Sequence, residues 1–415
     1  MLTIEVGGEA PEGGEGSTFE ACLNLTRKRS RSPTKNNGGN AMPMSSAGRR
    51  FLLCAAALGL GMLAGNVRAQ ELKDVQAAKT PLALEQEGSF YVGGHAAHVA
   101  ITGWDELGPD FGRMFGMPGD TTIGQMYVQF QKPVGWQKNV PIVFLHGCCL
   151  SSKTWETTPD GRMGWYEYFA RMGFPTYLAE QSGRARSGFD PSGFNEVRAG
   201  ELTPDKQKRV LIPTYQFAWS IFRFGPKYGS PWPDEQFPIE QVDQLYKQMI
   251  PDLILTEVPS LGKEFSSPTT DNPTVQNIAE LAKDLGGAIL VGHSQSSGMP
   301  TQAVLKGMPG IKGIIQLETG CFTNLTPPEV SQLAKVPMLV MVADHWGTPQ
   351  PPPECNAEMA RINKAGGDMT FISLPAIGIH GNSHMFMQDK NNLQVADVII
   401  KWIDQHVEHK TAQAN

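Results

Sequence analysis

Short apolar runs recur along most of the chain and predict an ordered series of strands. Two segments come first, at residues 89–100 and 124–132, and the second alternates apolar and polar positions. Continuous apolar runs, which are typical of buried parallel strands, follow them. These runs span residues 140–145, 175–179, 288–291, 313–317, 337–343 and 369–374.

Segments with helical spacing separate several of these strands. Residues 164–172 form a plausible helix, and Val275, Ile278, Leu281 and Leu285 lie on one helical face. A final helix carries Val395, Ala396, Ile399, Trp402 and Ile403 on one face. Strands that alternate with helices predict an α/β fold with a mostly parallel sheet of eight strands.

Residues 189–272 break this alternation, because no clear strand is evident there. The segment is rich in aromatic residues and proline, so we interpret it as a cap inserted between the fourth and fifth strands. Its aromatic residues could line a substrate site or fill the cap's own core, and both readings stay open. The core of the fold is then expected in two parts, at residues 70–188 and 273–415.

The first 69 residues have the features of a targeting segment. Arg49 and Arg50 precede an apolar run at residues 51–64, and Val67-Arg68-Ala69 follows it as a small-residue cleavage site. This order is typical of a secretory signal peptide, here preceded by an over-long start. The apolar run is short for a membrane span. We therefore expect cleavage near Ala69 and a periplasmic or secreted protein, with the twin-arginine route as an alternative.

Composition adds two constraints. The formal net charge of −6 argues against nucleic acid as the main partner, which would favour a basic face. Four of the six cysteines follow the predicted cleavage site, and an even number in an exported chain indicates disulfides. Four cysteines allow three pairings. These cysteines are Cys148, Cys149, Cys321 and Cys355.

The apolar run at residues 288–291 leads directly into Gly-His-Ser-Gln-Ser at residues 292–296. A serine flanked by small residues after a buried strand is typical of a nucleophile elbow, in which a sharp turn presents the serine above the sheet. The match is imperfect, because Ser296 stands where glycine is usual. The alternative is a strand-to-helix turn without chemistry. The pattern predicts Ser294 as the nucleophile.

The strand order and the elbow together match the α/β-hydrolase fold, in which an acid and then a histidine follow the nucleophile along the chain. The acid would be Glu318 or Asp344, and the base His384 or His380. Strand spacing alone favours Asp344. We expect His293 and His345 to have only structural roles.

The same fold predicts two backbone donors for an oxyanion hole. One is the N–H of Gln295, directly after the nucleophile, and the other is the N–H of Cys148, in the loop that begins at His146. Cys148 and Cys149 are adjacent, and could be two buried thiols. They could also form a strained disulfide, because neighbouring Cα atoms lie only about 3.8 Å apart. Such a ring would hold the donor loop rigid.

Several unusual runs resemble the bacterial vicinal-disulfide carboxylesterases of the Alcaligenes type, in the α/β-hydrolase superfamily. They span residues 146–165, 181–187, 219–226, 293–296 and 380–389. The resemblance extends over about residues 85–405. The chain departs from the esterase that it resembles in three places. That esterase has serine where this chain has Gly292, and this chain has an extra serine near Ser296. The segment after Glu318 is one residue shorter in this chain.

The resemblance implies an exported carboxylesterase with a cap and a triad of Ser294, His384 and Glu318. It reverses the choice of acid, so that Asp344 becomes the second choice. It also implies the disulfides Cys148–Cys149 and Cys321–Cys355.

We therefore expect hydrolysis of small-molecule carboxylic esters through an acyl-enzyme. An amidase, lactonase or polymer-ester hydrolase would use the same triad, and a non-catalytic or redox-sensing relative is a further alternative. We expect no cofactor and no metal, since the histidines form no cluster with ligand spacing. We expect no membrane span in the mature chain, and a homodimer stays open.

Overall fold

A computed structural model of the protein describes residues 72–103, 108–136, 139–207, 210–253, 272–322, 324–345 and 350–408. All of them belong to the unit Val67–Asn415. The predicted signal peptide, at residues 1–69, lies outside the described residues. Within the described ranges, no helix has both the length and the apolar character that a membrane crossing requires.

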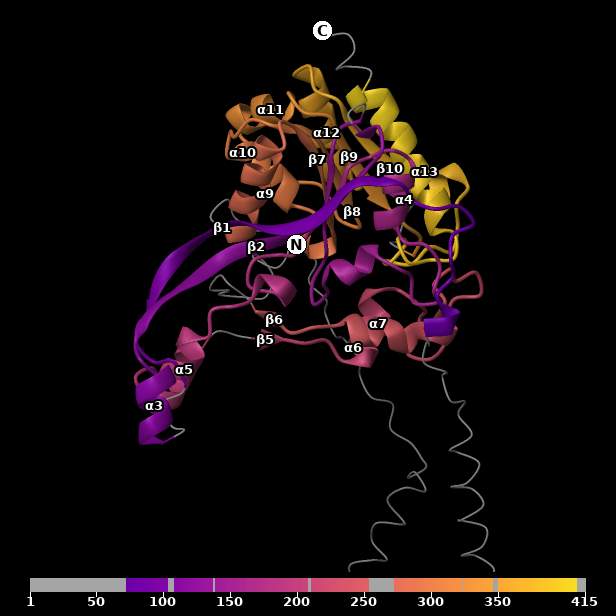
Figure 1. Ribbon diagram of the computed structural model, residues 1–415. Helices are drawn as coiled ribbons and strands as arrows, with labels where there is room; N and C mark the ends of the chain where they lie inside the picture. Colours follow the sequence, from indigo (N-terminus) through magenta and orange to yellow (C-terminus); the bar gives the residue numbers. More distant parts are fainter. Residues whose placement is uncertain are drawn as a thin grey trace, which may run out of the picture. The chain divides into compact units, whose positions relative to one another are not determined.

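An eight-stranded sheet is the frame of the fold (Figure 1). Its strand order is β1-β2-β4-β3-β7-β8-β9-β10. Strand β2 pairs antiparallel with β1 and β4, and all other neighbours are parallel. The strands are β1 (Leu84–Val99), β2 (Gly119–Pro133), β3 (Ile142–Leu145), β4 (Thr176–Ala179), β7 (Ala288–His293), β8 (Ile311–Leu317), β9 (Met338–Val342) and β10 (Met369–Ser373). The predicted eight-stranded, mostly parallel sheet is confirmed.

Both faces of the sheet are covered, because the strands are apolar on both sides. On β3, Ile142 and Phe144 join one buried cluster, while Val143 and Leu145 join the other. Helices α4 and α13 contribute to the first cluster, and α9 to α12 contribute to the second. The helices outside the inserted segment are α3 (Pro109–Phe115), α4 (Trp165–Arg171), α9 (Pro273–Asp284), α10 (Met299–Leu305), α11 (Pro327–Leu333), α12 (Pro353–Lys364) and α13 (Asn392–Ile403).

The order of the central strands places two loops side by side. The chain passes from β3 outward to β4 and then returns across β3 to β7. Such a reversal in a parallel sheet is where a crevice forms at the carboxyl ends of the strands. Leu145 pairs with Gly292, so Gly147 and Ser294 each lie two residues beyond the same register pair. The predicted oxyanion loop and the predicted elbow therefore start next to each other.

Among its described residues, the segment between β4 and α9 contains three α-helices and one small sheet. The prediction that it has no strand is wrong, because β5 pairs antiparallel with β6. Each of these strands has two residues, which is too short to give a pattern in the sequence. The elements are α5 (Ser192–Ala199), β5 (Val210–Leu211), α6 (Tyr215–Ile221), α7 (Val242–Gln248) and β6 (Asp252–Leu253).

The buried aromatic residues of this segment do not form a separate core. Trp219, Phe222, Phe224 and Phe237 belong to the same cluster as the α4 and α13 face of the sheet. Tyr215, Phe217 and Tyr228 are largely exposed instead. The segment is therefore anchored on the sheet by its aromatic side chains.

Candidate active site

Ser294 lies on a sharp turn at the carboxyl end of β7. Its φ of 55° is in the left-handed region, which is strained for a residue other than glycine. A Cβ added to Gly292 would lie 2.3 Å from the Ser296 carbonyl oxygen, so only glycine fits there. The hydroxyl of Ser296 accepts a hydrogen bond from the His293 N–H at 3.0 Å and lies 3.1 Å from the Leu145 carbonyl oxygen. Ser296 thus closes the turn from the position where glycine is usual.

The loop after β3 lies against this turn. A Cβ added to Gly147 would lie 3.0 Å from both Ser294 Cβ and His293 Nδ1. A disulfide joins Cys148 to Cys149, and the φ of Cys149 is 61°. A second disulfide joins Cys321 to Cys355. The loop that carries the predicted donor is therefore close to Ser294 and is cross-linked within itself.

Glu318 and His384 form a second pair of contacting side chains in the candidate site. Glu318 follows β8 directly, and its Oε2 lies 2.8 Å from His384 Nδ1. Its other oxygen, Oε1, accepts a hydrogen bond from the Ala343 N–H. The carboxylate accepts the Nδ1 hydrogen, so the Nε2 atom of His384 keeps its lone pair. Nε2 is buried and has no hydrogen-bond partner among the described residues.

The turn and the histidine are also connected directly. His293 Nε2 lies 2.9 Å from the His384 carbonyl oxygen, and the two imidazole rings are 4.8 Å apart. Since His293 immediately precedes Ser294, this contact fixes the backbone of His384 relative to the turn. Phe222 also stacks on the His384 ring, with the ring centres 5.8 Å apart.

Burial and nearby charges keep Glu318 and His384 in the protonation states that base catalysis needs. Burial alone would raise the pKa of Glu318, but the Arg223 guanidinium and the hydrogen bond from His384 lower that pKa to about 2. Burial lowers the pKa of His384, although Glu318 opposes this effect. Glu318 is therefore ionised and His384 neutral near pH 7.

The other predicted candidates have different partners. Asp344 Oδ2 lies 3.4 Å from His380 Nδ1, so this pair is separate from the pair of Glu318 and His384. Burial lowers the pKa of His293 to about 3, and the residue is neutral in its contact with the His384 carbonyl oxygen. His345 lies on a turn with a φ of 57°.

Arg223 was missed by the sequence reasoning, although it lies within one of the runs that carry the resemblance. It forms an ion pair with Glu318, and its Nη1 is 3.1 Å from His384 Nδ1. Its Nε donates to the Asp344 carbonyl oxygen at 3.1 Å. No local pattern distinguishes this arginine from others, because its partners are 95, 121 and 161 positions away in sequence.

One group of side chains has the composition of a metal site. The ligand atoms of Cys148, Cys149 and Asp252 all lie within 4.8 Å of one another. Cysteine binds metals as a thiolate, and here the two sulfurs are bonded to each other. In this state the group is a disulfide beside a buried carboxylate.

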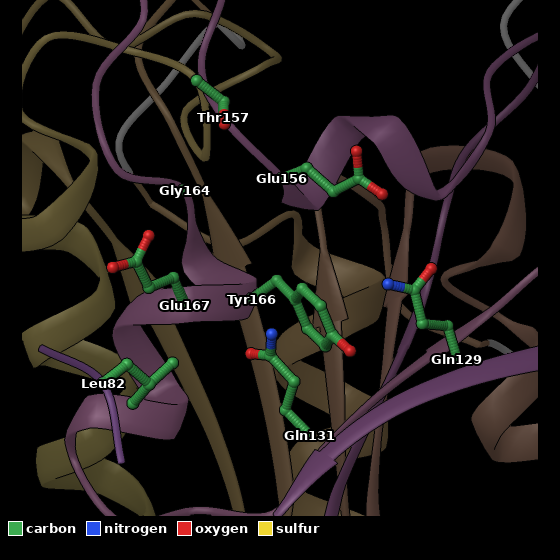
Figure 2. Close-up of a pocket in the computed structure, with 8 residues that line it drawn as sticks. All are labelled: Leu82, Gln129, Gln131, Glu156, Thr157, Gly164, Tyr166 and Glu167. Atoms are coloured by element: carbon green, nitrogen blue, oxygen red, sulfur yellow. The ribbon is translucent and has the colours of Figure 1, made fainter. Parts of the chain in front are cut away.

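A pocket lies between β2 and α4 (Figure 2). It has a volume of about 480 Å³ and is lined by Leu82, Gln129, Gln131, Glu156, Thr157, Gly164, Tyr166 and Glu167. Burial raises the pKa of Tyr166, so its hydroxyl stays protonated. The lining contains none of the residues that surround Ser294, so the pocket is distinct from the candidate active site.

The sheet order and the elbow define this protein as an α/β-hydrolase. It aligns with a solved structure reported as that of "a Novel Bacterial Esterase", with a TM-score of 0.70 and 42% identity, over 80% of this chain and 99% of that chain. The chain belongs to the bacterial carboxylesterases of the α/β-hydrolase superfamily, and it is a carboxylic ester hydrolase.

A second relative is more distant. The protein named "Probable secreted lipase phiG", from Fungal sp. (strain ATCC 74256), is 24% identical over 332 residues, which are 67% of this chain and 85% of that protein. No family model matches the chain.

Proposed function

We propose that the protein is an exported serine carboxylesterase that hydrolyses small-molecule esters through an acyl-enzyme on Ser294. The observation that carries this proposal is the 2.8 Å contact between Glu318 and His384, which leaves His384 Nε2 without a partner beside the elbow. An ionised acid, a neutral imidazole and a serine are the components of a nucleophilic triad, and the contact of His293 with His384 brings the turn that carries Ser294 to this pair.

In the proposed reaction, Ser294 Oγ attacks the ester carbonyl carbon while His384 Nε2 takes the hydroxyl proton. Glu318 holds His384 in the tautomer that carries its hydrogen on Nδ1, and it stabilises the imidazolium that forms. The imidazolium then gives its proton to the leaving alcohol, and an ester bond to Ser294 remains. A water molecule, activated by the same histidine, hydrolyses that ester and releases the acid.

The negative charge on the substrate oxygen develops only in the transition state, and fixed donors stabilise it there. The backbone N–H groups of Cys148 and Gln295 are the proposed donors. Support comes from the closeness of their two loops, since Gly147 packs against Ser294 Cβ. The Cys148–Cys149 disulfide would restrict the motion of one donor.

Export is supported by the order of charge, apolar run and small residues before Ala69. The similarity to a protein named as a secreted lipase agrees with it. The test is N-terminal sequencing of the protein recovered from a bacterial periplasm or medium. A mature start near Gln70 supports export, and recovery of the uncleaved chain from the cytoplasm alone contradicts it.

Hydrolysis of p-nitrophenyl acetate and butyrate tests the catalytic proposal. Ser294→Ala should lower kcat by about 10⁴ or more, because the remaining groups cannot form the acyl-enzyme. The control is Ser331→Ala on α11, where the hydroxyl donates to the Pro327 carbonyl oxygen, and activity should be retained. Full hydrolysis by Ser294→Ala would contradict the proposal.

A further inference from the structure

Asp252 is a buried carboxylate on β6 in the inserted segment, and its contacts are with the loops that follow β3, β4 and β7. Its exposed fraction is 0%, so its charge requires partners. Gln295 Nε2 donates to its Oδ2 at 3.0 Å, and Cys149 Sγ lies 4.0 Å from the same oxygen. Arg184, itself 7% exposed, forms an ion pair with Oδ1. One carboxylate thus contacts both loops next to Ser294.

The Gln295 contact bears on one proposed oxyanion donor. The donor is the backbone N–H of Gln295, and the hydrogen bond to Asp252 is made by the side chain of the same residue. A side chain fixed at its far end leaves the backbone of its own residue less freedom to rotate. Asp252 therefore restrains the direction of this N–H.

The Arg184 contact bears on the other donor. Arg184 Nη1 lies 3.5 Å from the Gly147 carbonyl oxygen, and His146 Nδ1 lies 3.0 Å from that oxygen. This carbonyl belongs to the same peptide unit as the Cys148 N–H. Because a trans peptide is planar, its C=O and N–H point in opposite directions. Donors that hold the Gly147 oxygen therefore also aim the Cys148 N–H.

Arg184 and Asp252 depend on each other in this arrangement. Burial lowers the pKa of Arg184, and Asp252 opposes this effect. Removing one partner of such a pair leaves an uncompensated buried charge, which is strongly destabilising. The arginine that holds the Gly147 peptide thus depends on the carboxylate that holds Gln295.

We propose that Asp252 is a positioning residue that aligns both oxyanion donors, one through Gln295 and the other through Arg184. The proposal rests on the esterase mechanism above and assigns the inserted segment a role in the chemical step. Oxyanion stabilisation acts in the transition state, so loss of alignment lowers kcat and leaves KM nearly unchanged.

Two variants test this without leaving a buried charge unpaired. Gln295→Met keeps the backbone N–H and removes the amide contact, and kcat should fall about tenfold. The double variant Asp252→Asn, Arg184→Gln removes both charges together, and kcat should fall about 10–100-fold. In both, KM for p-nitrophenyl butyrate should stay within about twofold. Circular dichroism and Tm establish that each variant is folded.

A double-mutant cycle shows whether Asp252 acts through Gln295. Adding Gln295→Met to the Asp252→Asn, Arg184→Gln variant should lower kcat by less than the product of the two separate effects. The matched control is Glu358→Gln, which breaks the contact of a buried carboxylate with Arg361 on α12. This control should lower Tm and leave kcat unchanged.

The positioning role is overturned if folded Gln295→Met and the double variant keep the wild-type kcat, or if their losses appear in KM alone. Gln295→Met decides the question even if the double variant does not fold. Labelling of the wild-type protein with a fluorophosphonate separates the two proposals. If Ser294 is not labelled, the esterase mechanism itself fails. If Ser294 is labelled and the variants match the wild type, only the positioning role fails.

Discussion

Glu318 Oε2 lies 2.8 Å from His384 Nδ1, although the two residues are 66 positions apart in sequence. Glu318 sits one residue past β8, the strand next to β7, and its φ is 61°. Asp344 follows β9 and pairs with His380 instead. The chain therefore places two acid–histidine pairs at the same edge of the sheet.

This pairing predicts which carboxylate supports the base. Glu318→Gln should lower kcat by about 10³–10⁴, because the amide cannot hold the Nδ1 tautomer or stabilise the imidazolium. Asp344→Asn is the matched control, and it should change kcat by less than about tenfold. Steady-state kinetics with p-nitrophenyl butyrate separate the two. The reverse order of effects would make Asp344 the acid.

The midpoint of the acid limb in the pH profile of kcat/KM should lie below pH 6.5. Catalysis needs the neutral imidazole, and burial lowers the pKa of His384, so the base stays active to lower pH than a free histidine. Arg223→Met removes a positive charge that disfavours the imidazolium, so the limb in kcat/KM should move to higher pH. Arg223→Lys keeps the positive charge and should move the limb less than Arg223→Met does. A downward shift in Arg223→Met would contradict this account.

Stability should fall in mild acid because of His293. Its pKa is about 3 in the folded protein and about 6.5 when unfolded, so between these values the unfolded chain binds a proton that the folded chain excludes. The stabilisation is complete above pH 6.5 and is lost as the pH falls toward 3. From pH 7 to pH 5, this single group should cost about 2 kcal/mol of unfolding free energy.

His293→Gln tests this, since its amide can still reach the His384 carbonyl oxygen. Urea unfolding at pH 7 and pH 5 should show a smaller decrease in unfolding free energy in the variant than in the wild type. An equal drop in both would show that other groups carry the acid sensitivity.

The two disulfides should have opposite effects on stability and activity. Cys321–Cys355 closes a loop between positions 34 apart, so replacing both with serine should cost about 2–4 kcal/mol and change kcat little. Cys148–Cys149 joins neighbours and closes almost no chain, so replacing both with alanine should leave the unfolding free energy nearly unchanged. The kcat of this alanine variant should fall, because the loop that carries the Cys148 N–H donor is no longer held by the disulfide.

Unfolding curves and ester hydrolysis on both double variants decide this prediction. If the vicinal variant loses stability but keeps its kcat, the disulfide is structural and does not hold the donor loop.

The sequence predicted the frame of the fold well, for a physical reason. Parallel strands are buried on both faces, so they appear as continuous apolar runs, such as residues 288–291 before Ser294. The elbow was recognisable too, because close packing behind Ser294 demands a glycine at 292. Both signals are local and follow from nearby packing.

The contacts around the site could not be predicted in the same way. Spacing favoured Asp344 as the acid, and only the resemblance favoured Glu318, because strand order does not specify which loop bends toward the histidine. Asp252 lies on a strand of two residues and contacts Arg184 and Gln295 from more than forty positions away. Such long-range polar contacts leave no periodic pattern in a single sequence.

Covalent labelling of Ser294 tests the central claim most directly. The purified protein is treated with a fluorophosphonate, digested, and mapped by mass spectrometry, with ester hydrolysis followed in parallel. The account predicts one adduct per chain, on Ser294, with loss of activity in proportion to labelling, and no adduct in Ser294→Ala. Full activity after complete labelling of Ser294, or inactivation with the adduct on another residue, would contradict it.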